Sequence, residues 1–112
     1  MIEQIILQYL ETTSMNVAVI TEIPPDPPDE YIIIKKAGSE RENHIDTATM
    51  QFDCCAKSKY RAAEISSELQ TAIEDMVTLD NVSCCEFGGD YDNTDTENKK
   101  YCYRVMYNIT YF

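Results

Sequence analysis

Cysteines are the residues best able to do chemistry in this chain of 112 residues. Four of the five form adjacent pairs, Cys54-Cys55 and Cys84-Cys85. Neighbouring residues of a strand point to opposite faces, so neither pair can hold one metal ion as a C-x-x-C motif does. One cysteine from each pair could meet across a sheet, but zinc would need further ligands, and the single histidine, His44, falls in a predicted turn. We therefore expect no metal site and expect inward-facing cysteines to act as small core residues.

A second possible chemistry is calcium binding by the acidic stretch of residues 90–98, DYDNTDTEN. An EF-hand loop needs glycine at its sixth position and glutamate at its twelfth. Counted from Asp90, these positions hold Asp95 and Tyr101, so the pattern fails. The stretch is instead predicted to be a solvated acidic loop, and weak binding of divalent ions by it stays open.

Catalysis and cofactor binding find no support in the sequence. A nucleophilic Ser or Cys needs a neighbouring base, and nothing pairs the lone histidine with one. The glycine-rich loops that cradle phosphates are absent, and the chain has only three glycines. We expect no catalytic residue, no cofactor and no enzyme activity.

The elements that would position these residues follow from hydrophobic periodicity. Apolar residues at helical spacing predict a helix over residues 2–10 and a longer one over 58–79, with Ser58 as its N-cap. Strands are predicted at residues 16–22, 31–36, 45–55, 82–87 and 101–111, with a polar turn over 37–44 and a loop from 88 to 99. The chain is thus predicted to be one α+β domain over residues 1–112. Its order is α-β-β-β-α-β-β, an antiparallel sheet of four to five strands with two helices packed on it.

Several patterns predict which side chains are buried. Three consecutive isoleucines in YIIIKK, residues 31–36, predict a strand that is covered on both faces. The predicted core of the long helix is one stripe of apolar residues: Ala62, Ile65, Leu69, Ile73 and Met76.

Charge and composition limit which classes of partner this protein can bind. The net charge is −11, with 9 basic and 20 acidic residues, and this opposes binding to nucleic-acid phosphates. An acidic wall could still line a channel through which DNA slides. The N-terminal stretch does not read as a signal peptide and nothing reaches the length of a membrane span, so we expect five reduced thiols in a cytoplasm and no membrane partner.

Two features predict an interface. All four prolines fall within residues 24–28, where they should hold an extended, solvated segment between two strands. Eight tyrosines are present, and this residue is enriched at interfaces; the alternative is that half of these rings cover the helices. The predicted interface residues are Pro24, Pro25, Asp26, Pro27, Pro28, Asp29, Tyr91, Asp92 and Tyr107.

The element order and a few local sequences resemble one known family. A proline-rich link leads into YIIIKKAG, and an alternating strand leads into FDCCAKSKYRAAEISSEL, in which Ala56, Ser58 and Ala62 match an A-x-S-x-x-x-A start of the long helix. This is similar to the tail-terminator and tail-completion proteins of long-tailed bacteriophages. The paired cysteines and the very acidic loop depart from that pattern.

The resemblance implies a non-enzymatic virion protein. It would form a homo-oligomeric ring, typically of six subunits, that caps the tail tube at the tail–neck junction. Its partners would be its own copies, the tail tube protein and a head-closure or neck protein, and DNA would pass through the ring without specific binding. Assembly would take place in the host cytoplasm. The alternatives are a head-closure neck component and, from another class, a small ligand-binding regulatory α+β domain; an enzyme fragment ranks lowest.

Overall fold

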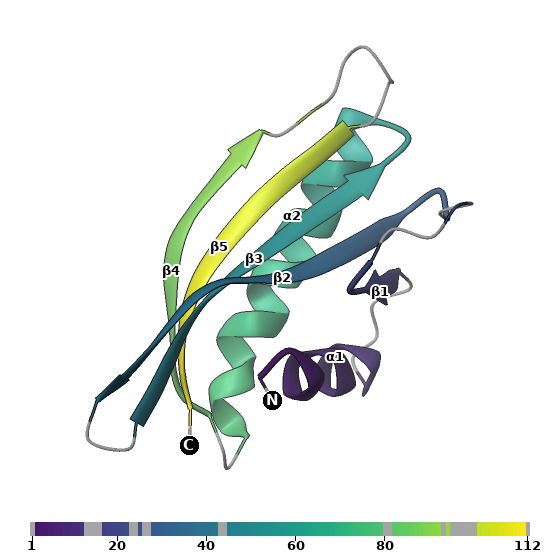
Figure 1. Cartoon of the computed structure of the whole chain (residues 1–112). Helices are drawn as coiled ribbons and strands as arrows, with labels where there is room; N and C mark the ends of the chain where they lie inside the picture. The colour runs from purple at the N-terminus through teal and green to yellow at the C-terminus, as the bar shows by residue number, and fades with distance from the viewer. Residues whose placement is uncertain are drawn as a thin grey trace.

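The structure, a computed structural model, describes residues 2–12, 17–22, 25, 28–42, 45–79, 82–92, 94 and 101–111. Two helices lie on one side of a curved five-stranded sheet (Figure 1). The helices are α1 (Ile2–Thr12) and α2 (Lys59–Asp75), and a 3-10 turn, η1 (Met76–Thr78), follows α2. The strands are β1 (Ala18–Ile20), β2 (Tyr31–Glu42), β3 (Ile45–Ala56), β4 (Val82–Asp92) and β5 (Tyr101–Tyr111). The predicted fold class and element order are confirmed.

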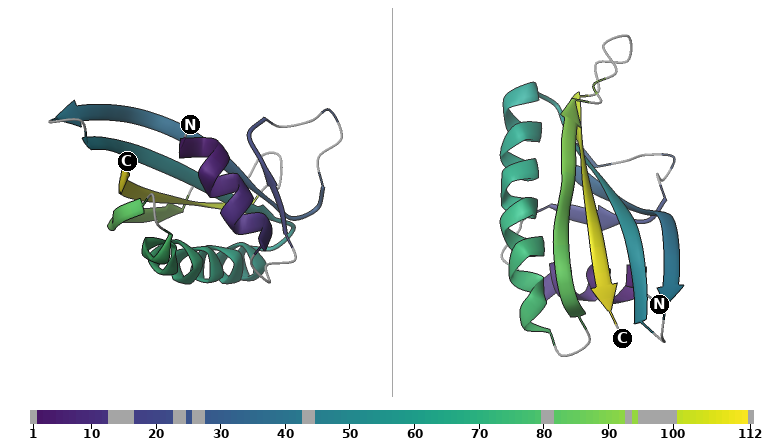
Figure 2. Two further views of the ribbon diagram at one scale, coloured as in Figure 1. Left: turned by 90° about the horizontal axis from the view of Figure 1, so that it is seen from below. Right: turned by 90° about the vertical axis from the view of Figure 1, so that its left-hand side faces the viewer.

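The strands lie in the spatial order β1-β2-β3-β5-β4. All neighbouring pairs are antiparallel except β1 and β2, which run parallel, so the sheet is mixed rather than purely antiparallel. The predicted β4–β5 hairpin is confirmed. Figure 2 shows both helices inside the curve of the sheet, so one sheet face is covered and the other, here called the open face, carries no helix.

The long helix forms as its sequence predicts. Ser58 has extended backbone and its side-chain oxygen accepts a hydrogen bond from the backbone N–H of Arg61, which satisfies one of the free donors of the first turn. The whole predicted stripe is buried: Ala62, Ile65, Leu69, Ile73 and Met76. It packs on alternate residues of β3 and β5, and Ile2, Ile6 and Leu10 of α1 complete the same core.

The isoleucine run of β2 is covered on both faces, as predicted. Ile32 and Ile34 face the helices and belong to the main core. Ile33 points to the open face, where it forms a small second cluster with Tyr31, Cys55 and Cys102. Alternation along the strand explains this split.

Two predicted loops are wrong in part. Residues 37–42 were expected in a polar turn, but they continue β2 and pair with the first residues of β3. Residues 88–92 were expected in a loop, but they continue β4 and pair with β5. In both cases a partner strand satisfies the backbone hydrogen bonds, and this outweighs the low strand propensity of glycine and charged residues.

β2 and β4 each carry an irregularity next to the level of Met50 and Tyr107 in the sheet. The β2–β3 register shifts between Lys36 and Gly38, and the β4–β5 register shifts between Phe87 and Gly89. Gly89 has a φ of 127°, a conformation that favours glycine. These bulges bend the edges of the sheet, and the far end of the β2–β3 hairpin projects away from both helices (Figures 1 and 2).

Candidate functional site

The predicted interface residues fall into three different environments. Pro25, Pro28 and Asp29 are exposed, whereas Pro24, Asp26 and Pro27 lie outside the described residues. Tyr91 and Asp92 lie at the end of β4, and both are exposed. Exposure of these five residues is compatible with a contact surface.

Tyr107 is a correction. Its side chain is 1% exposed and lies under α2, where its ring packs edge-on against Phe52 and Phe87 with centroids 6.5 and 5.5 Å apart. Burial raises the pKa of its hydroxyl to about 12. The tyrosines of β5 at odd positions face the helices, so the alternative explanation applies to this ring: it is core rather than interface.

The start of α2 brings the proline segment close to the end of β4. The Nζ of Lys57 lies 3.1 Å from a carboxylate oxygen of Asp29, and the Nζ of Lys59 lies 3.0 Å from one of Asp92. Arg61 also donates to both carboxylate oxygens of Glu30, at 2.7 and 3.3 Å. Three cations on alternate residues therefore hold two separate acidic segments at one end of the molecule.

Asp92 provides a pH-dependent reporter of this arrangement. Hydrogen bonds from Thr94 and Lys59 lower its pKa to about 2. Its contribution to stability is therefore present above the unfolded pKa, about 4, and is lost as the pH falls toward 2. Replacing Lys59 with methionine is expected to raise the Asp92 pKa, as measured by NMR titration of the side-chain carboxyl. Lys57→Met serves as the control, and an unchanged Asp92 pKa in K59M would contradict this ion pair.

The outer edges of the sheet are the feature that the sequence did not predict. β1 pairs only with residues 31–33 of β2, so within the described chain no strand covers residues 34–42. On the opposite side, no described strand covers the outer edge of β4. Unpaired N–H and C=O groups along such edges can pair with another chain. The length of these edges was not predicted, because residues 37–42 and 88–92 read as a turn and a loop and only residues 34–36 and 82–87 read as strands.

The two edges differ in charge. β4 carries Glu86, Asp90 and Asp92 and no basic residue. The free part of β2 is mixed, with Glu40 and Glu42 near its end and with Lys35 and Lys36, which are exposed and make no salt bridge with the described residues. Arg41 also lies there, but it already binds Asp46 through two hydrogen bonds of 2.6 and 3.2 Å, which lower the pKa of Asp46.

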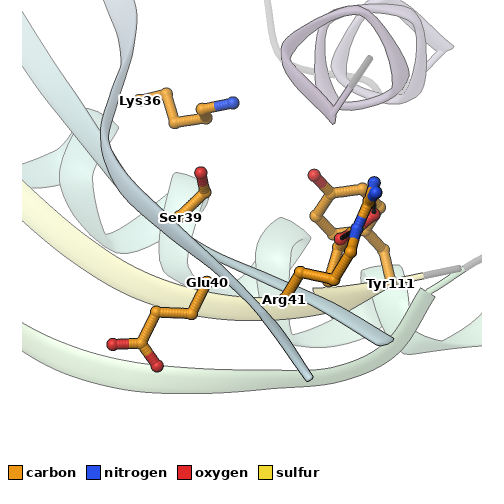
Figure 3. Close-up of a pocket in the computed structure, with 6 residues that line it drawn as sticks. Lys36, Ser39, Glu40, Arg41 and Tyr111 are labelled. Carbon is orange, nitrogen blue, oxygen red and sulfur yellow. Dashed lines mark hydrogen bonds and ion pairs between the residues drawn. The ribbon is translucent and has the colours of Figure 1, made fainter. Parts of the chain in front are cut away.

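A depression of about 350 Å³ lies beside this β2 edge. Figure 3 shows Lys36, Arg41 and Tyr111 on the side facing α1, with Glu40 pointing the other way. Its lining is polar and open, and it includes Ser39 and Asp46. Two cations could attract a small anion there, although Arg41 is already neutralised by Asp46.

The open face is polar along its centre. Hydrogen bonds link Thr49 to Asn108 at 2.8 Å, and the Oγ1 atoms of Thr47 and Thr110 lie 3.4 Å apart. Arg104 donates to Asp53 at 3.0 Å, so this one pair of charges is neutralised in place. The centre of the face therefore offers mainly hydrogen bonds, while the exposed charges Lys35 and Glu86 lie on its outer strands.

The cysteines do not behave as five free thiols. Cys55 and Cys102 occupy opposite positions on β3 and β5 and form a disulfide bond, which contradicts the prediction of fully reduced cysteines. Cys54 is buried in the main core, as expected for an inward-facing cysteine, and burial raises its pKa. Cys84 is exposed on β4, which β5 separates from β3. Cys54 and Cys84 therefore do not meet across the sheet.

Among the residues that the structure describes, no three His, Cys, Asp or Glu side chains form a group that could hold a metal ion. His44 and residues 93 and 95–98 of the acidic stretch 90–98 lie outside them. No described helix has the length and apolar character needed to cross a membrane. No protein-family model matches this sequence, and no curated protein matches it.

Proposed function

We propose that this protein is a structural assembly protein whose copies form a ring, of the kind that caps a bacteriophage tail tube at the head–tail junction. The observation that carries the proposal is the sheet with two long edges, on opposite sides, that no strand of the described residues covers. Two different edges allow head-to-tail contacts between copies, and head-to-tail contacts with a closing rotation generate rings. The element order is the one that the resemblance to tail-terminator proteins implies.

The charge distribution fits a ring through which DNA passes. A net charge of −11 disfavours retention of DNA phosphates, and the open face presents paired polar groups along its centre. In a ring closed through the sheet edges, this face is free to line the channel because both helices lie on the other side. The proline segment and the end of β4, which meet at the start of α2, would then form one rim for contacts with the tail tube or neck proteins.

The mass of the protein in solution tests this proposal. Sedimentation and native mass spectrometry are expected to show a closed oligomer, with six copies as the expected number, and micrographs of negatively stained protein are expected to show rings. A strict monomer or dimer at all concentrations, including after addition of tail tubes, would contradict it. Tails assembled without the protein distinguish a tail terminator from a head-closure component. Loss of control over tail length indicates a terminator, whereas tails of normal length that fail to join heads indicate a head-closure component.

The polar depression beside β2 supports one alternative, a small ligand-binding regulatory domain. That function predicts a monomer or dimer whose melting temperature rises with a small anion, and loss of this rise in Lys36→Met. An unchanged melting temperature across a panel of anions would remove the alternative.

A further inference from the structure

We propose that the subunits of the ring are joined edge to edge: the free edge of β2, residues 34–42, pairs with the β4 edge of the next copy. This inference rests on the proposed function. The contact would extend the sheet from subunit to subunit through backbone hydrogen bonds. The occupant of each edge is thus a second copy of this chain.

Strand direction permits this arrangement. β2 is antiparallel to β3, β3 to β5 and β5 to β4, so β2 and β4 run in opposite directions. A copy rotated about an axis roughly along the strands keeps its strand directions. Its β2 is therefore antiparallel to β4 of its neighbour, and the antiparallel order continues across the contact.

Charge favours head-to-tail pairing over a symmetric dimer through β4. A twofold β4–β4 contact would bring the acids of two β4 strands together; Asp92 is paired with Lys59, but Glu86 and Asp90 have no basic residue of β4 between them. Like charges on directly opposed strands are destabilising. The β2 edge instead offers Lys35 and Lys36, both exposed.

The level of the charges along the strands also matches. Successive subunits of a closed ring lie at the same height, so levels within the sheet are kept across a contact. Lys36 lies level with Met50, Tyr107 and Phe87, and Lys35 lies level with Gly89. Both lysines therefore meet the stretch of β4 that lies between Glu86 and Asp90.

The β2 edge has two acidic residues, Glu40 and Glu42, and both lie beyond the acids of β4. Glu40 lies level with Thr47, Thr110 and Cys84, where β4 carries no charge. Glu42 pairs with Ile45, one step before Asp46, which is at the level of Val82. Lys35 and Glu86 also share the open face, because their sheet partners Gln51 and Asn108 point there. The strand register, the shared sheet face and the opposite signs of the charges therefore all favour this contact.

Charge exchange between two variants tests the pairing. K35E/K36E has two acidic edges, and E86K/D90K has two basic edges. Each variant alone is expected to associate at least about tenfold more weakly than the wild-type chain. An equimolar mixture is expected to regain the wild-type oligomer mass, because alternating copies pair acidic with basic edges and an even ring closes.

Folding is checked by circular dichroism, and E68K/E74K, which changes the charge on the exposed side of α2 as much as E86K/D90K does on β4, is expected to associate like the wild-type chain. If the wild-type chain forms rings and both edge variants form them equally well, or if the folded variants fail to assemble when mixed, edge pairing is wrong while the ring stands. If the wild-type chain stays a monomer or dimer even at millimolar concentration and with tail tubes added, the ring and the pairing both fail.

Discussion

Replacing Leu69 with alanine is expected to lower the free energy of unfolding by about 2–5 kcal/mol. The side chain is fully buried in the centre of the α2 stripe, against the covered face of the sheet. Removing it costs the transfer free energy of the lost carbons and leaves a cavity that β3 and β5 cannot fill, because strand backbones held by neighbours on both sides relax little. Denaturant titration of dilute protein at low association measures the loss.

Glu68 is the matched control for Leu69. It is the preceding residue of the same helix and is exposed, so Glu68→Ala is expected to change the free energy of unfolding by less than about 0.5 kcal/mol. Leu69→Met, which nearly conserves volume, is expected to cost less than about 1.5 kcal/mol. A loss below about 1 kcal/mol in Leu69→Ala would mean that another face of α2 packs on the sheet.

Breaking the Cys55–Cys102 disulfide is expected to be comparably costly. The bond joins positions separated by 47 residues, and closing a loop of that size removes unfolded-state entropy worth about 4 kcal/mol in the chain-entropy model. The double variant C55A/C102A is therefore expected to lose about 2–4 kcal/mol in denaturant titrations under oxidising conditions.

Reduction separates the covalent bond from the packing of the two side chains. Reducing agent is expected to destabilise the wild-type chain and to leave C55A/C102A unchanged. Cys84→Ser, at an exposed free thiol, is the control and is expected to respond to reduction like the wild-type chain. If reducing agent does not alter the stability of the wild-type chain, the two cysteines are thiols in solution and the original prediction of reduced cysteines is reinstated.

The sequence predicted those parts of the fold that depend on local periodicity. The α2 stripe, its Ser58 cap and the alternation of β3 and β5 could all be predicted, because each is encoded by neighbours in the chain. The extensions of β2 and β4 could not be predicted, because residues 37–42 and 88–92 become strands only through distant partners. The disulfide could be predicted only from the β3–β5 register, which places Cys55 opposite Cys102.

The candidate site was predicted less well for the same reason. Tyr91 and Asp92 were chosen by composition and are exposed, but Tyr107 is core, since tyrosines on the covered side of a strand pack beneath a helix. The free edges are properties of sheet order, and local patterns in the sequence do not show which strand lies outermost. Once the order is known, the charges of β2 and β4 can be interpreted directly.

The bulges at Lys36–Gly38 and Phe87–Gly89 bear on whether a newly synthesised chain aggregates through its exposed edge strands. A long, regular, exposed edge strand would capture any extended chain in a crowded cell and seed aggregates. An irregularity in the middle of each edge leaves only short regular stretches, too few hydrogen bonds to hold a casual partner. In the proposed edge-to-edge contact, Lys36 and Phe87 share one level and the two bulges lie on either side of it. If the ring forms in this way, a free subunit is expected to stay dispersed until it meets another copy, because the backbone of each edge matches few other strands.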